Sequence, residues 1–235
     1  MSAIAIVLTQ MGHEVSGSDI RETPILDALR VLGVKVNVGH DPNVVLGCDS
    51  VTFSAAIPSN NIELEAARQN KIALLSRGQI LADICGRKKS IGVAGTHGKT
   101  TTSSMLMLML LDADMEPSFI IGGDVVDVGT GARWSTGSIL VVEADESDGT
   151  HRQIPLVGTI LTNIDVDHLD HFGSLDGIMA GFDAYLSGIT GPRVICLDDE
   201  RCARLVQKHS AITYGIVAEA EMKATRITFE HGMSA

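Results

Sequence analysis

Residues Gly95–Thr102 have the types and the spacing that hold a triphosphate. They read Gly-Thr-His-Gly-Lys-Thr-Thr-Thr between an apolar stretch at 91–94 and another at 105–111. This order predicts a strand, a glycine turn and a helix, in which backbone N–H groups and the helix N-terminus approach phosphate oxygens. Lys99 would then reach the β- and γ-phosphates, and Thr100 would offer its hydroxyl to Mg²⁺.

The match to a phosphate loop has one departure. The usual pattern places a glycine five positions before Gly98, and this chain has Val93 there. The alternative interpretation is a tight turn between strand and helix that carries a lysine. The run Met105–Leu111 that follows is apolar on every side, which favours a fully buried helix over a soft groove for a partner.

A second group of polar residues follows the apolar run at 139–142. An all-apolar strand is typical of a parallel sheet covered on both faces, and ligands bind beyond the carboxyl ends of such strands. Glu143 stands at that end and is placed like a carboxylate that holds a metal beside the phosphate loop. Glu146 and Asp148 fit a solvated acidic turn instead.

A third polar group follows the strand predicted at 157–162. Asp167, His168, Asp170 and His171 have side chains that bind metals. The spacing of the two histidines is too short for a usual zinc site, and Mg²⁺ prefers oxygen ligands. From the residues alone, a functional and a structural role for these histidines stay equally open.

These groups need an α/β fold to position them. Strand and helix patterns alternate along the chain, which predicts parallel sheets covered by helices. We expect a Rossmann-like domain at 1–86 and a P-loop-type parallel α/β domain at 87–235. Both are expected to be incomplete. The chain starts at a helix predicted at 2–11, without the strand and glycine-rich turn that open such a unit, and it ends after a lone strand predicted at 223–230.

The composition excludes several classes of partner. The formal net charge of −11 argues against nucleic acid and against an anionic membrane. No apolar run is long enough to span a bilayer, and no leader peptide is recognisable, so the protein is expected in the cytoplasm. The cysteines lack a Cys-x-x-Cys spacing and are interpreted as small apolar residues in a reducing compartment; they are Cys48, Cys85, Cys196 and Cys202.

Taken together, the motifs resemble the Mur ligase family. The resemblance rests on Gly95–Thr101, on 143–148 and on 162–170, and it extends to Ser16–Asp19 and Ser54–Pro58 near the start. It therefore covers nearly the whole chain, with three ordered motifs. Within the family, the branch that joins L-alanine to UDP-N-acetylmuramate is the most similar. The resemblance implies an enzyme of peptidoglycan precursor synthesis, and hence of cell-wall growth, cell shape and division.

The resemblance also implies roles for single residues. Lys99 would hold the phosphates, Thr100 and Glu143 would hold Mg²⁺, and His168 would complete a second metal site. Asp19 would touch the UDP moiety. The implied catalytic residues are thus Lys99, Glu143 and His168, and the nucleotide would be bound by Gly95, Thr96, His97, Gly98, Lys99, Thr100 and Thr101.

The implied reaction is ATP-dependent amide synthesis through an acyl phosphate. ATP would phosphorylate the muramate carboxylate, and the amine of L-alanine would displace the phosphate. Because about half of a typical family member is missing, the chain as given is not expected to ligate. The alternatives are a muramate ligase that recycles a tripeptide, a folylpolyglutamate synthase, a switch-type NTPase, and a non-catalytic nucleotide-binding remnant.

Overall fold

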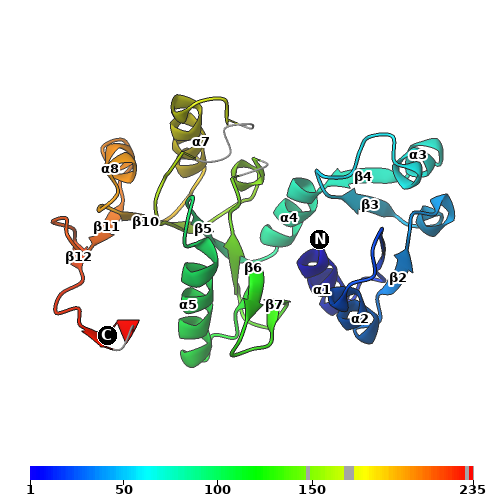
Figure 1. Cartoon of the computed structure of the whole chain (residues 1–235), viewed down its shortest axis with the longest axis horizontal. Helices are drawn as coiled ribbons and strands as arrows, with labels where there is room; N and C mark the ends of the chain where they lie inside the picture. Colours follow the sequence, from blue (N-terminus) through cyan, green and yellow to red (C-terminus); the bar gives the residue numbers. More distant parts are fainter. Residues whose placement is uncertain (147–148, 167–171, 231–232, 235) are drawn as a thin grey trace.

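The computed structural model describes residues 1–146, 149–166, 172–230 and 233–234. In Figure 1 the chain forms an N-terminal part, coloured blue to cyan, and a central part, coloured green to red. The two parts are joined by α4 (Arg77–Cys85), which runs into β5 (Lys89–Ala94) after only three residues. Within the described residues, no helix is long and apolar enough to cross a membrane.

Local sequence rules set the helices of the N-terminal part. α2 begins at Pro24, where a missing N–H is tolerated in the first turn. Asn61 caps α3, because its side chain accepts from the N–H groups of Glu63 and Leu64. The elements before α4 are α1 (Ser2–Gln10), β1 (Ser16–Asp19), α2 (Pro24–Val31), β2 (Lys35–Val38), the 3₁₀ helix η1 (Pro42–Val45), β3 (Ser50–Phe53), α3 (Ile62–Gln69) and β4 (Ala73–Ser76).

The N-terminal strands form two separate sheets. β1 pairs with β2 and β3 pairs with β4, each pair parallel, as the alternation of strands and helices predicts. Between the described residues of the two pairs there is no ladder. Each strand of this part therefore has one neighbour, which leaves its other edge without a strand.

The central part is built on one sheet of eight strands in the order β12-β11-β10-β9-β5-β8-β6-β7. Every pair is parallel except β6–β7. This confirms the predicted α/β class with a mainly parallel sheet. Besides β5, its strands are β6 (Ser118–Val125), β7 (Thr130–Arg133), β8 (Ile139–Glu143), β9 (Gly158–Leu161), β10 (Arg193–Cys196), β11 (Ile212–Gly215) and β12 (Met222–Lys223).

Helices cover this sheet on both faces (Figure 1). On β8, Val141 packs in one apolar cluster with Met107 of α5 (Lys99–Asp112), whereas Leu140 packs in another with Phe182 of α7 (Leu175–Ser187). Because successive residues of a strand point to opposite faces, α5 and α7 lie on opposite sides. The remaining elements are α8 (Glu200–Val206), the 3₁₀ helix η2 (Thr150–Arg152) and a hairpin of β13 (Phe229–Glu230) and β14 (Met233–Ser234).

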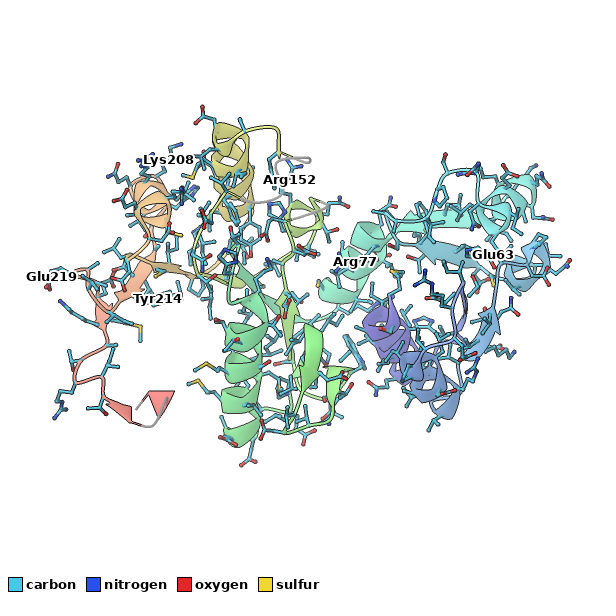
Figure 2. The ribbon with its side chains drawn as sticks, in the orientation of Figure 1. Glu63, Arg77, Arg152, Lys208, Tyr214 and Glu219 are labelled. Carbon is cyan, nitrogen blue, oxygen red and sulfur yellow. The ribbon has the colours of Figure 1, made fainter. Side chains whose placement is uncertain are left out.

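The joint between α4 and β5 is tightly bonded. Lys88 donates to the carbonyl oxygens of Ser135 (2.6 Å) and Gly137, and its ammonium lies 4.3 Å from the ring centre of Trp134. The Ser90 hydroxyl donates to the carbonyl oxygen of Cys85 at 2.7 Å. α1 also meets the sheet, because Gln10 accepts a hydrogen bond from the N–H of Trp134 at 2.7 Å. Figure 2 shows Glu63 and Arg77 on the N-terminal side of this joint.

The structure corrects two expectations. The α5 run is not fully buried, because Met105 and Met109 are 59% and 67% exposed. The strand predicted at 223–230 is interrupted, since only β12 and β13 form there and Arg226 adopts a positive φ of 58°. A left-handed residue breaks the extended backbone that a continuous strand needs.

Candidate functional site

Three neighbouring strands deliver polar residues to one edge of the central sheet. β5 lies between β8 and β9, with Val93 opposite Glu143 and Ala94 opposite Leu161. Because the strands are parallel, the residues after their carboxyl ends meet at the same edge. The structure thus brings the glycine loop after β5 beside Glu143 and beside the segment that follows β9.

The loop itself requires glycine at two positions. Gly95 has a φ of +129° and Gly98 has a φ of +82°, a region that other residues rarely enter. At Gly95 a Cβ atom would also lie 2.2 Å from Oγ1 of Thr162 and 2.8 Å from the carbonyl oxygen of Asn163. Both the backbone conformation and the close packing therefore require a glycine at position 95.

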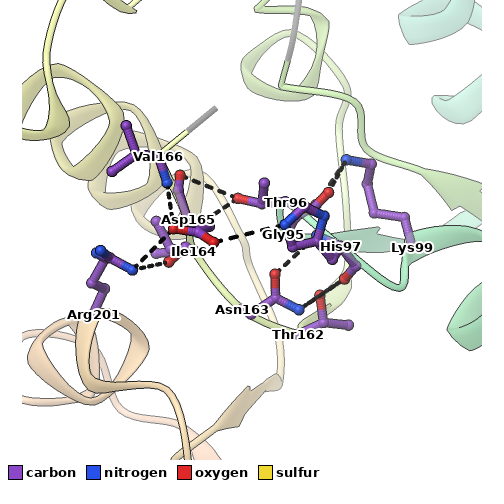
Figure 3. Close-up of polar contacts among 10 residues, drawn as sticks. All are labelled: Gly95, Thr96, His97, Lys99, Thr162, Asn163, Ile164, Asp165, Val166 and Arg201. Carbon is purple, nitrogen blue, oxygen red and sulfur yellow. Dashed lines mark hydrogen bonds and ion pairs between the residues drawn. The ribbon is translucent and has the colours of Figure 1, made fainter. Parts of the chain in front are cut away.

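The segment after β9 clamps this loop (Figure 3). The Asn163 side chain makes hydrogen bonds to both backbone groups of His97. Its Oδ1 accepts from the His97 N–H at 2.9 Å, and its Nδ2 donates to the His97 carbonyl oxygen at 2.9 Å. The Asn163 carbonyl accepts from the N–H of Thr96 at 3.0 Å, and the Thr162 hydroxyl donates to the His97 carbonyl at 2.7 Å. The N–H groups of Thr96 and His97 are therefore used to fix the loop.

The first turn of α5 is the part of the loop open to an anion. Gly98 is the N-cap, and no side chain within the described residues caps this helix. The N–H groups of Lys99, Thr100 and Thr101 have no partner inside the helix, because an α-helix leaves its first N–H groups without one. Together with the helix dipole, this end can bind a phosphate.

Lys99 is held by a carboxylate that the sequence did not single out. Its Nζ lies 3.0 Å from both Oε1 and Oε2 of Glu146 and 2.7 Å from the carbonyl oxygen of Gly95. Glu146 is only 2% exposed, so its assignment to a solvated turn was wrong. Burial raises the pKa of this carboxyl, and the bond from Lys99 opposes that shift.

Glu143 and Thr100 each lie beside a glycine of β6. A Cβ on Gly122 would be 2.7 Å from Oε2 of Glu143, and a Cβ on Gly123 would be 3.6 Å from Cγ2 of Thr100. Oε1 of Glu143 is buried and has no hydrogen-bond partner among the described residues. A buried carboxylate oxygen without a partner fits the oxygen ligands that Mg²⁺ prefers.

The metal ligands predicted after β9 lie outside the part of the chain that the structure describes. Within the described residues no group of three or more His, Cys, Asp or Glu side chains could hold a metal. His168 belongs to 167–171, which lie outside the described residues, as do Asp167, Asp170, His171 and Asp148.

A cavity of about 270 Å³ lies between the N-terminal and central parts. Its lining includes the first residues of α1, Arg77 of α4, and Gly122, Glu143 and Asp145 of the central part. Arg77 and Asp145 approach to 3.9 Å across the joint. Residues of both parts therefore line one cavity together with Glu143.

Asp19 lies in the other part of the chain, at the end of β1. It is exposed, and its Oδ1 accepts from the N–H of Arg21 at 3.1 Å. The neighbouring Ser18 donates to Glu63 at 2.6 Å, and the buried Glu63 also lies 3.2 Å from Nδ1 of His40. Asp19 is therefore not brought to the glycine loop by any described contact.

Comparison with known families decides the wider relationship. Residues 1–89 match the family described as "Mur ligase family, catalytic domain", and residues 93–235 match "Mur ligase middle domain". The chain belongs to the Mur ligase family. This confirms the resemblance of the three motifs.

Individual Mur ligases resemble most of this chain. It is 39% identical over 232 residues to UDP-N-acetylmuramate–L-alanine ligase of Acidiphilium cryptum, covering 97% of this chain and 48% of that protein. The enzyme of that name from Aquifex aeolicus is 37% identical over 236 residues, covering 99% of this chain and 52% of that protein. The chain spans about half the length of the curated relatives it matches.

Solved Mur ligases share its fold. A UDP-N-acetylmuramate–alanine ligase from Thermotoga maritima is 28% identical with a TM-score of 0.84, covering 93% of this chain and 50% of that chain. A Neisseria ligase whose acceptor is a tripeptide, L-alanyl-γ-D-glutamyl-meso-diaminopimelate, is 26% identical with a TM-score of 0.83, covering 91% and 74%. The shared fold therefore does not separate the alanine branch of the Mur ligases from the tripeptide branch.

Three residues of this site were missed from the sequence: Glu146, Thr162 and Asn163. For Glu146 the misleading pattern was the acidic run 143–148, which resembles a solvated turn. For Asn163 a usable pattern existed, because a polar residue directly after a buried parallel strand lies at the ligand edge.

Proposed function

We propose that the glycine loop binds the triphosphate of ATP. The support is the uncapped first turn of α5 beside the left-handed Gly98, with Lys99 fixed over the loop. Thr96 and His97 shape this cradle through their bonds to Asn163, and the N–H groups from Gly98 to Thr101 face the phosphates. This divides the predicted nucleotide-binding residues into those that hold the loop and those that hold the ligand.

Magnesium is the metal that we place beside the phosphates. Thr100 and Glu143 offer oxygen ligands, and the partnerless Oε1 of Glu143 is the observation that supports a cation there. His168 is proposed as a further ligand on the resemblance alone. Mg²⁺ would supply neutralisation of the phosphate charge, and Lys99 would hold its ammonium group beside the phosphates.

For the N-terminal part we propose the UDP-sugar. A boundary near residue 86 would separate this substrate-binding domain from the ATP-binding domain, and Asp19 at the end of β1 would contact the UDP moiety. The cavity between the two parts supports this arrangement, because Arg77, the first turn of α1 and Glu143 all line it. A diphosphate and a helix N-terminus with an arginine are complementary in charge.

The overall activity that we propose is ligation of L-alanine to the carboxylate of UDP-N-acetylmuramate in peptidoglycan precursor synthesis. The observation that carries it is the 36–39% identity to the alanine ligases over nearly all of this chain. ATP would convert the carboxylate to an acyl phosphate, and the amine of L-alanine would displace phosphate. Because this reaction consumes ATP, we propose that the protein acts in the cytoplasm.

The experiment is calorimetric titration with Mg-ATP of the wild-type chain and of Lys99→Ala. We expect the variant to bind about 100-fold more weakly, because a hydrogen bond to a charged group contributes about 1.5–3 kcal/mol. Lys89→Ala is the matched control, since Lys89 is an exposed lysine at the opposite end of β5. Equal affinity of Lys99→Ala and wild type would reject the nucleotide site.

The acceptor is tested separately. Phosphate release is measured with UDP-N-acetylmuramate and Mg-ATP, and either L-alanine or the tripeptide is added. Release that rises only with L-alanine supports the proposal, and no release with either acceptor is expected if the chain, which spans about half the length of its relatives, does not ligate by itself. Release that rises only with the tripeptide would assign the chain to the other branch.

A further inference from the structure

The contacts of Lys99 account for most of its hydrogen-bonding capacity. A lysine ammonium has three N–H donors. One is directed to the carbonyl of Gly95 at 2.7 Å, and Glu146 receives Nζ symmetrically, with both oxygens at 3.0 Å. The carbonyl of Thr96 is further away, at 3.4 Å. A phosphate that approaches the loop therefore meets an ammonium already bonded to a carboxylate.

The pair is also nearly removed from water. Glu146 is 2% exposed, and the Lys99 side chain is 15% exposed. Charges in such a place are weakly screened, so each one acts strongly on a neighbouring phosphate. Separating the two would leave the carboxylate buried without a partner, which is strongly unfavourable. Lys99 therefore stays bonded to Glu146 when a phosphate arrives.

We propose that Glu146 sets the nucleotide affinity of the loop by neutralising Lys99. This rests on the proposed ATP site. The ion pair as a whole brings no net charge to the phosphates, so the loop holds the nucleotide less tightly than a free lysine would. An enzyme that must release ADP after each cycle benefits from such a limit, since tight product binding slows turnover.

Charge balance at this pair predicts a ranking of four proteins. Glu146→Gln keeps the shape and a hydrogen-bond acceptor but leaves the pair positive. Lys99→Ala removes the positive charge and leaves the buried Glu146 without its partner. The double variant is neutral, like the wild type. Affinity for Mg-ATP and Mg-ADP should therefore be highest in Glu146→Gln and lowest in Lys99→Ala, with the double variant recovering part of the loss.

The test is calorimetric titration of Mg-ATP and Mg-ADP into these proteins as full 235-residue chains. We expect Glu146→Gln to bind about tenfold more tightly than wild type, and the double variant to bind about tenfold more tightly than Lys99→Ala. Glu63→Gln is the matched control, because Glu63 is also buried, at 8% exposed, but lies in the N-terminal part. It should leave both affinities unchanged.

The outcomes separate this inference from the nucleotide site itself. If wild type binds and Lys99→Ala weakens binding, but Glu146→Gln binds equally or more weakly, Glu146 does not limit affinity and the inference fails. If Lys99→Ala changes nothing, the proposed ATP site fails instead. Thermal unfolding of each variant identifies any loss of fold; should Glu146→Gln not fold, the comparison of the double variant with Lys99→Ala decides alone, and no recovery there overturns the inference.

Discussion

The loop after β5 and the end of β1 are both strand ends of parallel sheets, yet they differ in how firmly they are built. β5 has a strand on each side, and the loop that follows it is bonded by Thr162 and Asn163. β1 has only β2 as a neighbour, and Asp19 is exposed. A rigid binding loop therefore depends on residues contributed by adjacent strands as well as on its own motif.

Two glycines make the same comparison at atomic scale. Gly95 and Gly39 both have positive φ, +129° and +88°, and each follows a strand closely. A Cβ on Gly95 would clash with Thr162, whereas a Cβ on Gly39 would meet no atom within 4 Å. Only the central glycine is locked by its surroundings.

The largest expected effect comes from alanine at these two positions. Gly95→Ala combines a strained φ with an atom 2.2 Å from Thr162 Oγ1, so we expect a loss of about 3 kcal/mol of stability and no measurable Mg-ATP binding. Gly39→Ala has the strain alone and should cost about 1 kcal/mol. Chemical denaturation measures both.

Similar losses of stability in the two glycine variants would contradict this distinction between the two loops. They would mean that backbone strain dominates and that the packing of Thr162 against the loop contributes little. Nucleotide binding by Gly95→Ala would also contradict the role given to the loop shape.

The next effect concerns the clamp. Asn163→Ala removes two hydrogen bonds to His97, so we expect about 2 kcal/mol lower stability and about tenfold weaker Mg-ATP binding. Asn70→Ala is a suitable control, because Asn70 also bonds the backbone, at the end of α3, but lies far from the loop in sequence and fold. Unchanged nucleotide affinity in Asn163→Ala would show that the loop keeps its shape without the clamp.

A smaller effect is expected at the open end of β1. Asp19→Asn should change stability by less than about 0.5 kcal/mol, because the side chain is exposed. Binding of UDP-N-acetylmuramate should weaken about fivefold through the loss of a charged acceptor. Asp49→Asn is the control, because Asp49 is another exposed acidic residue of the N-terminal part. An equal loss of affinity for UDP-N-acetylmuramate in Asp49→Asn would show that Asp19 acts only through the net charge of this part.

The smallest effect is a dependence of stability on pH in the central part. Asp198 accepts from the N–H groups of Ala218 (2.7 Å), Ile216 (2.6 Å) and Val217 (3.0 Å), and these bonds lower its pKa below the ordinary 3.8. A lowered folded pKa adds stability above the unfolded value and loses it as pH falls through the folded one. The midpoint temperature of thermal unfolding should therefore decrease less steeply from ~pH 6 to ~pH 3 in Asp198→Asn than in wild type.

Much of the fold was predictable because it follows local rules. The helix predicted at 2–11 is α1 (Ser2–Gln10), and the strand predicted at 157–162 is β9 (Gly158–Leu161), because apolar periodicity acts within a few residues. No local pattern predicts β7. β7 reads Thr-Gly-Ala-Arg, a short run without alternation, and it forms through antiparallel pairing with β6.

The site was predictable only where the motif itself carried the chemistry. The positions of Lys99, Thr100 and Glu143 at one sheet edge follow from their strand ends. The pairing of Lys99 with Glu146 does not follow from the strand ends, because it depends on where the segment after β8 lies in the folded chain. Contacts between residues 47 positions apart are set by tertiary packing and leave no local pattern.

The tight joint after α4 has a mechanical consequence. Lys88 is tied to Ser135 and Gly137, and Ser90 is tied to Cys85, so the three residues between α4 and β5 have little freedom to bend. The end of α4 is thus fixed against the start of β5, the strand that leads to Gly95. A ligand that moved the end of α4 would therefore also have to move the start of β5 or break these bonds.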